Sequence, residues 1–371
     1  MIEIREAKTE QELKDFVKFP FSLYSKSPYW VPPIIKDELK SFNLSNDIFK
    51  SVDVHFYLAY KQNKLVGRIA VCINWTEVKE LNKPKVRFGW LEMIDDIEVT
   101  KALIRKAEEL AIKHDLVYIE GPMGFSNMDK AGMLTEGFDQ IATMIGLYNH
   151  PYYPQHLEKL NFKTEAEWME YKLDITAFNP RKINVMAELI SQRYEVKLLK
   201  FKTIKQLVPY VDEMFALLNK TYADLQSFVP IQQFQIEHYK KQYLAFIHPD
   251  YISCVMDKNN KMIAFSITMP SFSKAFQKAN GKMFPFGFLH LLGAMKKNDR
   301  AEFYLIGIDP DYQNKGVNAL MFKEIYHNFM KKGVKHIETN PLLLENNKIQ
   351  QLWKQFNPII HKRRKTFRKD M

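Results

Sequence analysis

Apolar and polar positions along this chain are spaced in a way that predicts strands and helices in turn. Residues 99–113 place apolar side chains three and four positions apart, which predicts a helix, and the apolar run 116–119 predicts a buried strand directly after it. Residues 55–73 form two extended runs separated by a polar turn at Asn63, the pattern of a β-hairpin. This order of elements favours the α/β (α+β) fold class.

The same order of elements occurs twice along the chain. A strand–helix pair is predicted at 3–16 and again at 197–210, and a hairpin at 55–73 and again at 251–269. A helix–strand pair follows at 99–121 and 317–339, and a short helix after an asparagine at 149–160 and 346–356. Four matches in one order predict two copies of a single domain. We place the boundary within 174–193 and expect an N-terminal domain of residues 1–178 and a C-terminal domain of residues 179–371.

Composition narrows the class of protein. The chain has 371 residues, of which 46% are hydrophobic and 26% charged, which excludes disordered and fibrous proteins. Two cysteines, Cys72 and Cys254, make no disulfide framework. No apolar run reaches the roughly 18 to 20 residues of a membrane span, and the N-terminus has no apolar signal core. We therefore predict a cytoplasmic protein without a membrane span.

The charge balance favours anionic partners. There are 54 Lys and Arg against 43 Asp and Glu, a net charge of +11. Part of this excess lies in residues 361–369, which we interpret as a solvated terminal tail, and no nucleic-acid partner is expected because no nucleic-acid-binding motif accompanies the charge. No His, Cys and carboxylate residues occur at metal-ligand spacing, so no metal site is expected.

One turn in the second copy has the character of an anion site. A predicted strand at 303–308 ends at Asp309, and residues 311–318 lead directly into a helix. The first amides of a helix lack intrahelical partners and, with the helix dipole, attract phosphate oxygens. We expect Gly316 to let a ligand approach the backbone, and Gly307 to mark a bulge that opens the sheet.

These residues resemble a known family. Residues 312–320 are similar to the pyrophosphate loop of the GCN5-related N-acetyltransferase (GNAT) superfamily, with Gln313 and Gly316 in place and Asn318 where that pattern has Gly or Ala. The stretch from Asn346 to Trp353 resembles a later segment of the superfamily's pattern, an asparagine followed by a short helix. Trp353 stands where the superfamily often has a tyrosine general acid. The resemblance implies two tandem GNAT-like domains, each with a mixed, mostly antiparallel sheet flanked by helices.

The resemblance also implies a co-substrate, acetyl-CoA or another acyl-CoA. Two parallel strands splay apart in that fold, and the pantetheine arm pairs with the exposed backbone of the first strand while the next helix holds the pyrophosphate. The implied contact residues are Ile306, Ile308, Gln313, Asn314, Lys315, Gly316, Val317, Asn318 and Asn346. The acceptor is a small-molecule or peptide amine whose identity stays open, as do the acyl chain length and the oligomeric state.

The N-terminal copy departs from the pattern. Its connection from Asp95 to Leu103 is three residues shorter than its counterpart and contains no glycine, and Asp96 and Glu98 would repel a pyrophosphate. We expect this copy to be a scaffold or substrate-binding domain. A glycine-rich stretch at 121–138 in that copy either lines a cleft or packs the structure together.

For the chemistry we expect direct attack of an amine on the thioester. Glu302 and Tyr304 are the catalytic candidates, with the Ile308 amide polarising the carbonyl, and Glu338 is a further candidate for the base. His327, His336 and His361 lie in the same half of the chain, near the expected cleft. Three hypotheses follow: an N-acyltransferase with an active C-terminal domain, a non-catalytic acyl-CoA-binding protein, and an aminoacyl-tRNA-dependent transferase of similar tandem fold. The retained turn argues against the third, whereas Asn318 and Trp353 favour the second.

The second copy has an insertion of its own. Residues 270–300 contain an aromatic run at 284–289 with Pro and Gly. We interpret that run either as a loop that packs into the core or as an apolar lid.

Overall fold

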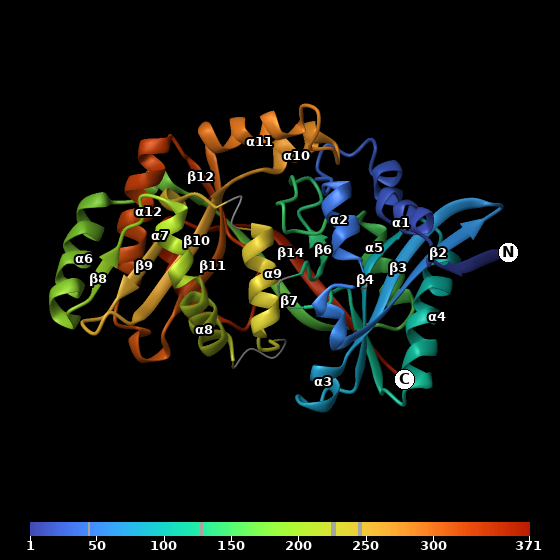
Figure 1. The fold of residues 1–371 in the computed structure, drawn as a ribbon. Coiled ribbons are helices and arrows are strands. Elements are labelled where there is room, and N and C mark those ends of the chain that lie inside the picture. The colour runs from blue at the N-terminus through green and yellow to red at the C-terminus, as the bar shows by residue number, and fades with distance from the viewer. Residues whose placement is uncertain (44, 127–128, 224–227, 244–246) are drawn as a thin grey trace. The chain divides into compact units, whose positions relative to one another are not determined.

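The chain forms two compact units that interleave in sequence (Figure 1). The computed structural model describes residues 1–43, 45–126, 129–223, 228–243 and 247–371. Unit 1 comprises Met1–Met169, Phe272–Leu292 and His361–Met371, and unit 2 comprises Glu170–Ser271 and Gly293–Ile360. The expected division into 1–178 and 179–371 has a single boundary. The two units have several, because Phe272–Leu292 and His361–Met371 also belong to unit 1.

Unit 1 is built on a mixed sheet with the strand order β1-β2-β3-β4-β5-β14-β7. Its strands are β1 (Ile2–Glu6), β2 (Val52–Lys61), β3 (Lys64–Asn74), β4 (Lys85–Met93), β5 (Tyr118–Gly121), β14 (Ile359–Asp370) and the first part of β7 (Lys163–Asp174), with β6 (Met133–Glu136) paired to β14. Strands β1 to β4 pair antiparallel, and β4 pairs with β5 parallel.

Unit 2 repeats the arrangement with the strand order β7-β12-β11-β10-β9-β8. Its strands are β8 (Lys197–Leu199), β9 (Ile252–Met256), β10 (Met262–Pro270), β11 (Arg300–Ile308), β12 (His336–Glu338), the last part of β7, and β13 (Leu342–Leu343) on β7. Strands β8 to β11 pair antiparallel and β11 pairs with β12 parallel. Both expected hairpins, β2–β3 and β9–β10, are therefore confirmed.

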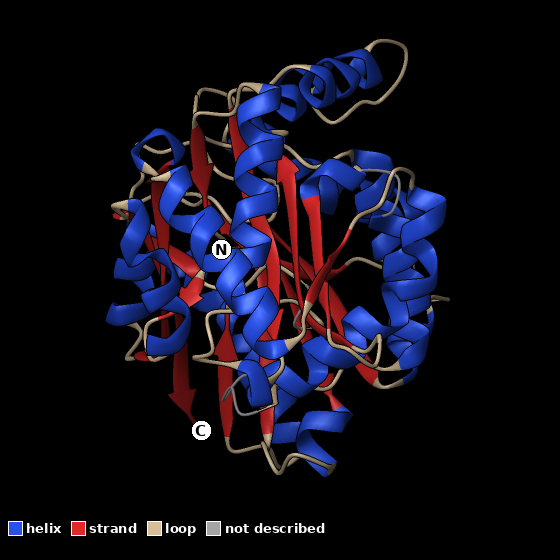
Figure 2. Ribbon diagram, turned by 90° about the vertical axis from the view of Figure 1, so that its left-hand side faces the viewer, coloured by secondary structure: helices blue, strands red, loops and turns tan. Residues whose placement is uncertain are grey.

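Helices flank the strands of both units (Figure 2). Those of unit 1 are α1 (Glu10–Leu23), α2 (Ile35–Ser41), α3 (Trp75–Lys79), α4 (Ile97–Lys113), α5 (Tyr152–Lys159), α10 (Ser273–Ala279) and most of α11 (Gly287–Lys296). Those of unit 2 are α6 (Pro180–Tyr194), α7 (Ile204–Leu207), α8 (Val211–Tyr222), α9 (Gln233–Tyr243), α12 (Asn318–Lys332) and α13 (Asn347–Trp353). No helix in the described residues is both long and apolar enough to cross a bilayer.

The amphipathic helix predicted in the first copy is α4, and its apolar stripe builds the core of unit 1. Leu103, Ala107 and Ala111 on this stripe are fully buried. They belong to one cluster with side chains of β3, β4 and β5, including Phe88 and Ile119. Spacing of three and four residues puts these side chains on one side of the helix, which explains why α4 lies on the sheet.

The glycine-rich stretch 121–138 is tied into unit 1 by its own polar groups. Arg87 donates to the carbonyl of Gly124 at 3.0 Å, and a carboxylate oxygen of Asp129 accepts from the amide of Ser126 at 2.8 Å. Residues 127–128 within the stretch lie outside the described residues. These contacts favour the interpretation of the stretch as a packing element.

The basic C-terminal stretch is a buried strand, so the expectation of a solvated tail at 361–369 is wrong. Strand β14 pairs antiparallel with β5 and β6, and the side chains of Lys362 and Arg364 are 1% exposed. Near its end, the guanidinium of Arg368 lies 3.8 Å from the centre of the Tyr118 ring. The partners of these charges come from distant parts of the sequence, so the local run of charge could not reveal them.

We predict that shortening Phe367 will destabilise the fold, whereas the same change at the start of β14 will not. Phe367 is 1% exposed in the core of unit 1, so Phe367→Ala should lower the free energy of unfolding by about 3–5 kcal/mol. Ile359→Ala is the control, because Ile359 is 65% exposed and the change should cost less than about 0.5 kcal/mol. Chemical denaturation measures both, and equal midpoints would contradict the burial of β14.

Candidate functional site

The candidate site begins where two parallel strands of unit 2 separate. Strand β12 pairs with β11 only over Arg300–Glu302, in register with His336–Glu338. Beyond Glu302, β11 continues to Ile308 while remaining paired with β10 on its other side. The second half of β11 therefore has one edge that β12 does not cover.

The backbone groups of Ile306 and Ile308 point to that uncovered edge. The amide of Asp309 donates to the carbonyl of Ile263 at 2.8 Å, so Asp309 faces β10. Because backbone groups alternate between the two edges of a strand, those of Ile308 and Ile306 face away from β10. The structure thus gives both residues the orientation that pairing with an extended ligand requires.

Two side chains of unit 2 already use the carbonyls at this edge. The hydroxyl of Tyr222 donates to the carbonyl of Ile306 at 3.1 Å, and the amide group of Gln313 donates to the carbonyl of Ile308 at 3.2 Å. Burial raises the pKa of Tyr222 to about 12, so it stays protonated and remains a donor. These bonds fix the edge of β11 in position.

The turn after β11 is held by Asp309, whose side chain is almost fully buried. Its carboxylate accepts from the ammonium of Lys220 at 2.7 Å and from the amide of Asp311 at 3.1 Å, and its carbonyl accepts from the amide of Gln313 at 3.1 Å. Burial alone would raise the pKa of Asp309, but these donors hold it below its ordinary value. Asp309 therefore stays charged and orders the turn.

The start of α12 presents three consecutive amides with no partner. The N–H groups of Gly316, Val317 and Asn318 donate to no acceptor among the residues that the structure describes. Asn314 and Lys315 beside them are exposed. Since α12 has 15 residues, its dipole adds to these amides, and the structure provides the anion-binding geometry expected at this turn.

Lys315 is placed by two aromatic rings. Its ammonium lies 5.3 Å from the centre of the Tyr312 ring and 5.5 Å from that of Tyr194, on α6. An exposed lysine held in this way keeps its charge close to the amides of α12, where it can meet a phosphate.

The structure adds a packing reason for each of the two glycines and moves the bulge away from Gly307. Gly316 has φ +76°, and a Cβ there would lie 3.1 Å from the side chain of Ile190 on α6, so the glycine is required by its backbone conformation and by helix packing. At Gly307 a Cβ would lie 2.7 Å from the ring of Phe265 on β10. That glycine makes room for a core side chain and does not mark the bulge.

The bulge of β11 lies at Tyr304, one of the two catalytic candidates. The register between β10 and β11 shifts there, leaving Tyr304 as one extra residue between Phe303 and Leu305. Its hydroxyl donates to the carboxylate of Glu302 at 3.1 Å. Glu302 is 2% exposed and Tyr304 is 9% exposed, so the two catalytic candidates form a buried pair.

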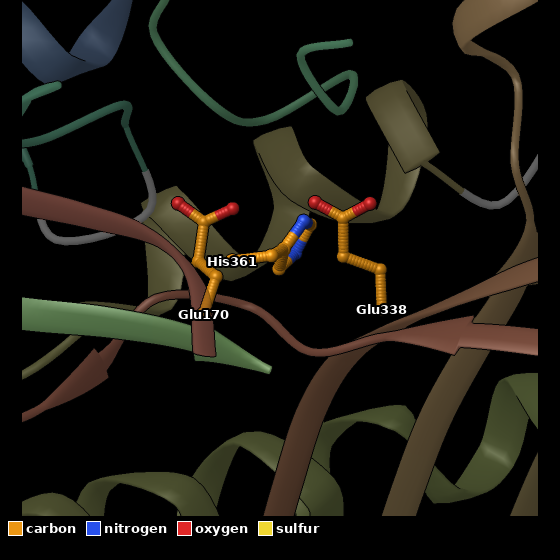
Figure 3. A group of neighbouring side chains, drawn as sticks. All are labelled: Glu170, Glu338 and His361. Carbon is orange, nitrogen blue, oxygen red and sulfur yellow. The ribbon is translucent and has the colours of Figure 1, made fainter. Parts of the chain in front are cut away.

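A second group of proton-accepting side chains lies on neighbouring strands. Glu338 at the end of β12 is the register partner of Glu302, which puts both carboxylates on one face of the sheet. Glu170 on β7 and His361 on β14 lie close to Glu338 (Figure 3). A carboxylate oxygen of each glutamate and a ring nitrogen of His361 all lie within 4.8 Å of one another. Sequence spacing did not reveal this group, because its members come from three distant segments.

Asn346 and Trp353 have structural roles in this fold. The side-chain oxygen of Asn346 accepts from the amide of Ile349 at 3.2 Å and so caps α13. Trp353 is 1% exposed, with its ring centre 4.7 Å from that of Phe303 and 5.6 Å from that of Phe322. It is therefore a core residue and no substitute for a proton donor.

In the equivalent helix of unit 1, α4, the amides of Glu98, Val99 and Thr100 are all bonded to Asp96. The side chain of Asp96 accepts from the amide of Glu98 at 3.0 Å, and its carbonyl accepts from the amides of Val99 and Thr100. Lys61 pairs with the same carboxylate at 2.7 Å, which lowers the pKa of Asp96. This helix start is therefore capped by its own residues.

Side chains also occupy the strand edge of unit 1. Strand β4 pairs with β5 over three residues only, like β11 with β12. Beyond them, the amide of Met123 donates to the carbonyl of Phe88 at 2.8 Å, as the amide of Asn340 donates to that of Phe303 in unit 2. The hydroxyl of Tyr152 donates to the carbonyl of Met93 at 2.7 Å, and the amide of Met93 donates to the hydroxyl of Tyr153 at 3.0 Å. Both backbone groups of Met93 are thus bonded within unit 1, whereas the side chains at the corresponding edge of unit 2 bond the carbonyls of Ile306 and Ile308.

Behind that edge lies a buried polar network. Tyr153 and Tyr24 both donate to the carboxylate of Glu92, and Arg68 lies 3.9 Å from it. Burial raises the pKa of Glu92, an effect that Arg68 and the two hydroxyls partly offset. Because all four side chains are at most 7% exposed, the network has the character of a structural element of unit 1.

Comparison with known proteins gives distant relatives in sequence. The chain is 23% identical over 377 residues to "Protein YghO" of Escherichia coli strain K12, covering 99% of this chain and 95% of that protein. It is 24% identical over 315 residues to "Bacterial ceramide synthase" of Caulobacter vibrioides strain NA1000, covering 82% of this chain and 80% of that protein. No protein-family model matches the chain.

Solved structures match over the whole chain. A tandem GNAT protein from the clavulanic acid biosynthesis pathway superposes with a TM-score of 0.59 at 11% identity, covering 100% of this chain and 98% of that one. A GCN5-related N-acetyltransferase from Sphaerobacter thermophilus gives a TM-score of 0.52 at 8% identity, with coverage of 100% and 95%. With its two repeated units, the chain has the tandem fold of the GCN5-related N-acetyltransferase superfamily.

Proposed function

We propose that the chain is an acyl-CoA-dependent N-acyltransferase whose donor site lies in unit 2. The observation that carries this proposal is the open edge of β11 beside the three unpartnered amides at the start of α12. An acyl-CoA would supply the thioester, with its pantetheine arm along Ile306 and Ile308 and its pyrophosphate at Gly316–Asn318. Unit 1, with its capped helix, serves as scaffold or substrate-binding unit.

In the proposed reaction, an amine attacks the thioester carbonyl directly. The new C–N bond forms, the C–S bond breaks, the amine loses a proton and the departing thiolate gains one, so amide and free CoA are the products. The amides of Ile306 and Ile308 face the open edge, and that of Ile306, the nearer of the two to Glu302, is the one proposed to polarise the carbonyl oxygen. Glu302 is the proposed base and Tyr304, bonded to it, positions its carboxylate.

The acceptor class follows from one of the relatives. A ceramide is an N-acylated long-chain amino alcohol, so the similarity to a protein called bacterial ceramide synthase makes a sphingoid base the first amine to test, together with long-chain acyl-CoA. At 24% identity this similarity guides the choice of substrate and does not fix it.

We predict that Lys315→Glu will weaken CoA binding by about tenfold, because it replaces an attractive charge by a repulsive one beside the pyrophosphate. The stabilisation of the protein by CoA in a thermal-shift titration measures the affinity. Lys331→Glu is the matched control: Lys331 is exposed at the other end of α12 and should leave the titration unchanged. If both variants lose CoA-dependent stabilisation equally, or neither loses any, the result would count against the site at Gly316–Asn318.

We predict that Glu302→Gln will lower the amine-dependent release of free CoA by about 10²-fold while the thermal shift with CoA is retained, because the change removes the base but not the donor site. A thiol-reactive dye measures the release. Glu338→Gln is the comparison, since Glu338 is the register partner of Glu302. If only Glu338→Gln is inactive, the base belongs to the group of Glu170, Glu338 and His361.

The same assays separate the two competing hypotheses. CoA binding without release of CoA by any amine would support a non-catalytic binding protein. Stabilisation by aminoacyl-tRNA, with none by CoA, would support the aminoacyl-tRNA-dependent transferase.

A further inference from the structure

The segment between β10 and β11 carries a surface that the acyltransferase site does not use. Residues 271–299 contain five lysines and a single acidic residue, Asp299, next to the start of β11. They form α10, a turn and α11, which Figure 1 shows as a helical hairpin.

Four large apolar side chains of this hairpin lie in water. Phe284 is 76% exposed, Phe286 67%, Leu289 51% and Leu292 54%. Single exposed apolar residues are ordinary, but four within nine consecutive positions mark an interaction surface. We call these four residues the α11 surface. The interpretation of 284–289 as a core-packing loop is therefore wrong for both exposed phenylalanines.

The geometry of the hairpin gathers these side chains on one side. Leu289, Leu292 and Gly293 are spaced by three and four residues, so they share a face of α11. Two backbone hydrogen bonds close the turn before them. The amide of Phe288 donates to the carbonyl of Met283 at 2.8 Å, and the amide of Leu289 donates to the carbonyl of Phe286 at 3.1 Å. These backbone bonds order the turn that carries Phe284 and Phe286.

Helix α10 anchors the hairpin so that α11 can stay exposed. Phe272 and Phe276 are buried, and the hydroxyl of Ser273 donates to the carbonyl of Ala142 at 2.8 Å. The side chain of Gln277 donates to the carbonyls of Pro28 and Trp30. All of these partners belong to unit 1, so the hairpin is fixed through α10 and not through the α11 surface.

The charges around the α11 surface complement an anionic interface. The lysines of the segment are all exposed, at positions Lys274, Lys278, Lys282, Lys296 and Lys297. Lysine ammonium groups beside exposed aromatic and leucine side chains are the combination with which peripheral helices bind anionic bilayers. Helix α11 has ten residues, too few to cross a bilayer, so it can only lie at the surface.

We propose that the α11 surface inserts into the headgroup region of an anionic phospholipid bilayer, with the five lysines facing the lipid phosphates. A second copy of the chain fits less well, because a symmetric contact would bring two sets of five lysines together with only Asp299 of each segment to offset them. The proposal is independent of the acyltransferase function, since it involves no residue of that site.

Sedimentation with vesicles tests the proposal. The full chain should bind vesicles of phosphatidylcholine with phosphatidylglycerol and bind phosphatidylcholine alone more weakly. Phe284→Ser with Phe286→Ser should reduce binding to the mixed vesicles by at least about tenfold, because the largest inserted side chains are lost. Lys278→Gln, Lys282→Gln and Lys297→Gln together should reduce it similarly and remove the preference for anionic lipid.

The matched control is Ile112→Ser with Val117→Ser, two exposed apolar residues elsewhere in unit 1 that should not affect binding. Thermal melts establish that every variant is folded. The proposal is overturned if the wild-type chain does not sediment with anionic vesicles, or if the control and the phenylalanine variant lose binding equally. Concentration-dependent dimers that the phenylalanine variant abolishes, without vesicle binding, would instead assign the α11 surface to a second copy.

Discussion

The account depends on the separation of β12 from β11 after Glu302. Parallel strands that stay paired leave no backbone groups for a ligand, whereas here the second half of β11 keeps β10 on one edge only. The turn ordered by Asp309 then leads into α12, so a strand edge and a helix start with free amides follow each other within a few residues. An extended ligand with a pyrophosphate needs these two features in this order.

In unit 1, the chain's own side chains bond the strand edge and the helix start that correspond to the proposed donor site of unit 2. Its β4 and β5 separate in the same way, yet tyrosines from α5 bond to Met93, and Asp96 caps α4. The polar groups that unit 2 leaves for a ligand are satisfied from within, because unpaired buried backbone groups are costly. The two units thus keep one architecture while one of them has the features of a donor site.

The repeat, the hairpins, the helices and the turn at 311–318 were predictable from the sequence, because they depend on local spacing and on residues close together in the chain. The pairing of β14 with β5, the group of Glu170, Glu338 and His361, and the burial of Glu302 depend on contacts between distant segments. A residue type can also be required for more than one physical reason, and the sequence alone does not show which reason applies. Gly316 is required by its φ and by Ile190, and Trp353 by the core.

Amide hydrogen exchange with and without CoA tests the central claim most directly, since it reads the proposed backbone contacts themselves. The account predicts slower exchange on CoA addition for the amides of Gly316, Val317 and Asn318 and for those of Ile306 and Ile308, with no change at the start of α4. Protection at Glu98 to Thr100 instead, or none at the start of α12 at saturating CoA, would contradict it.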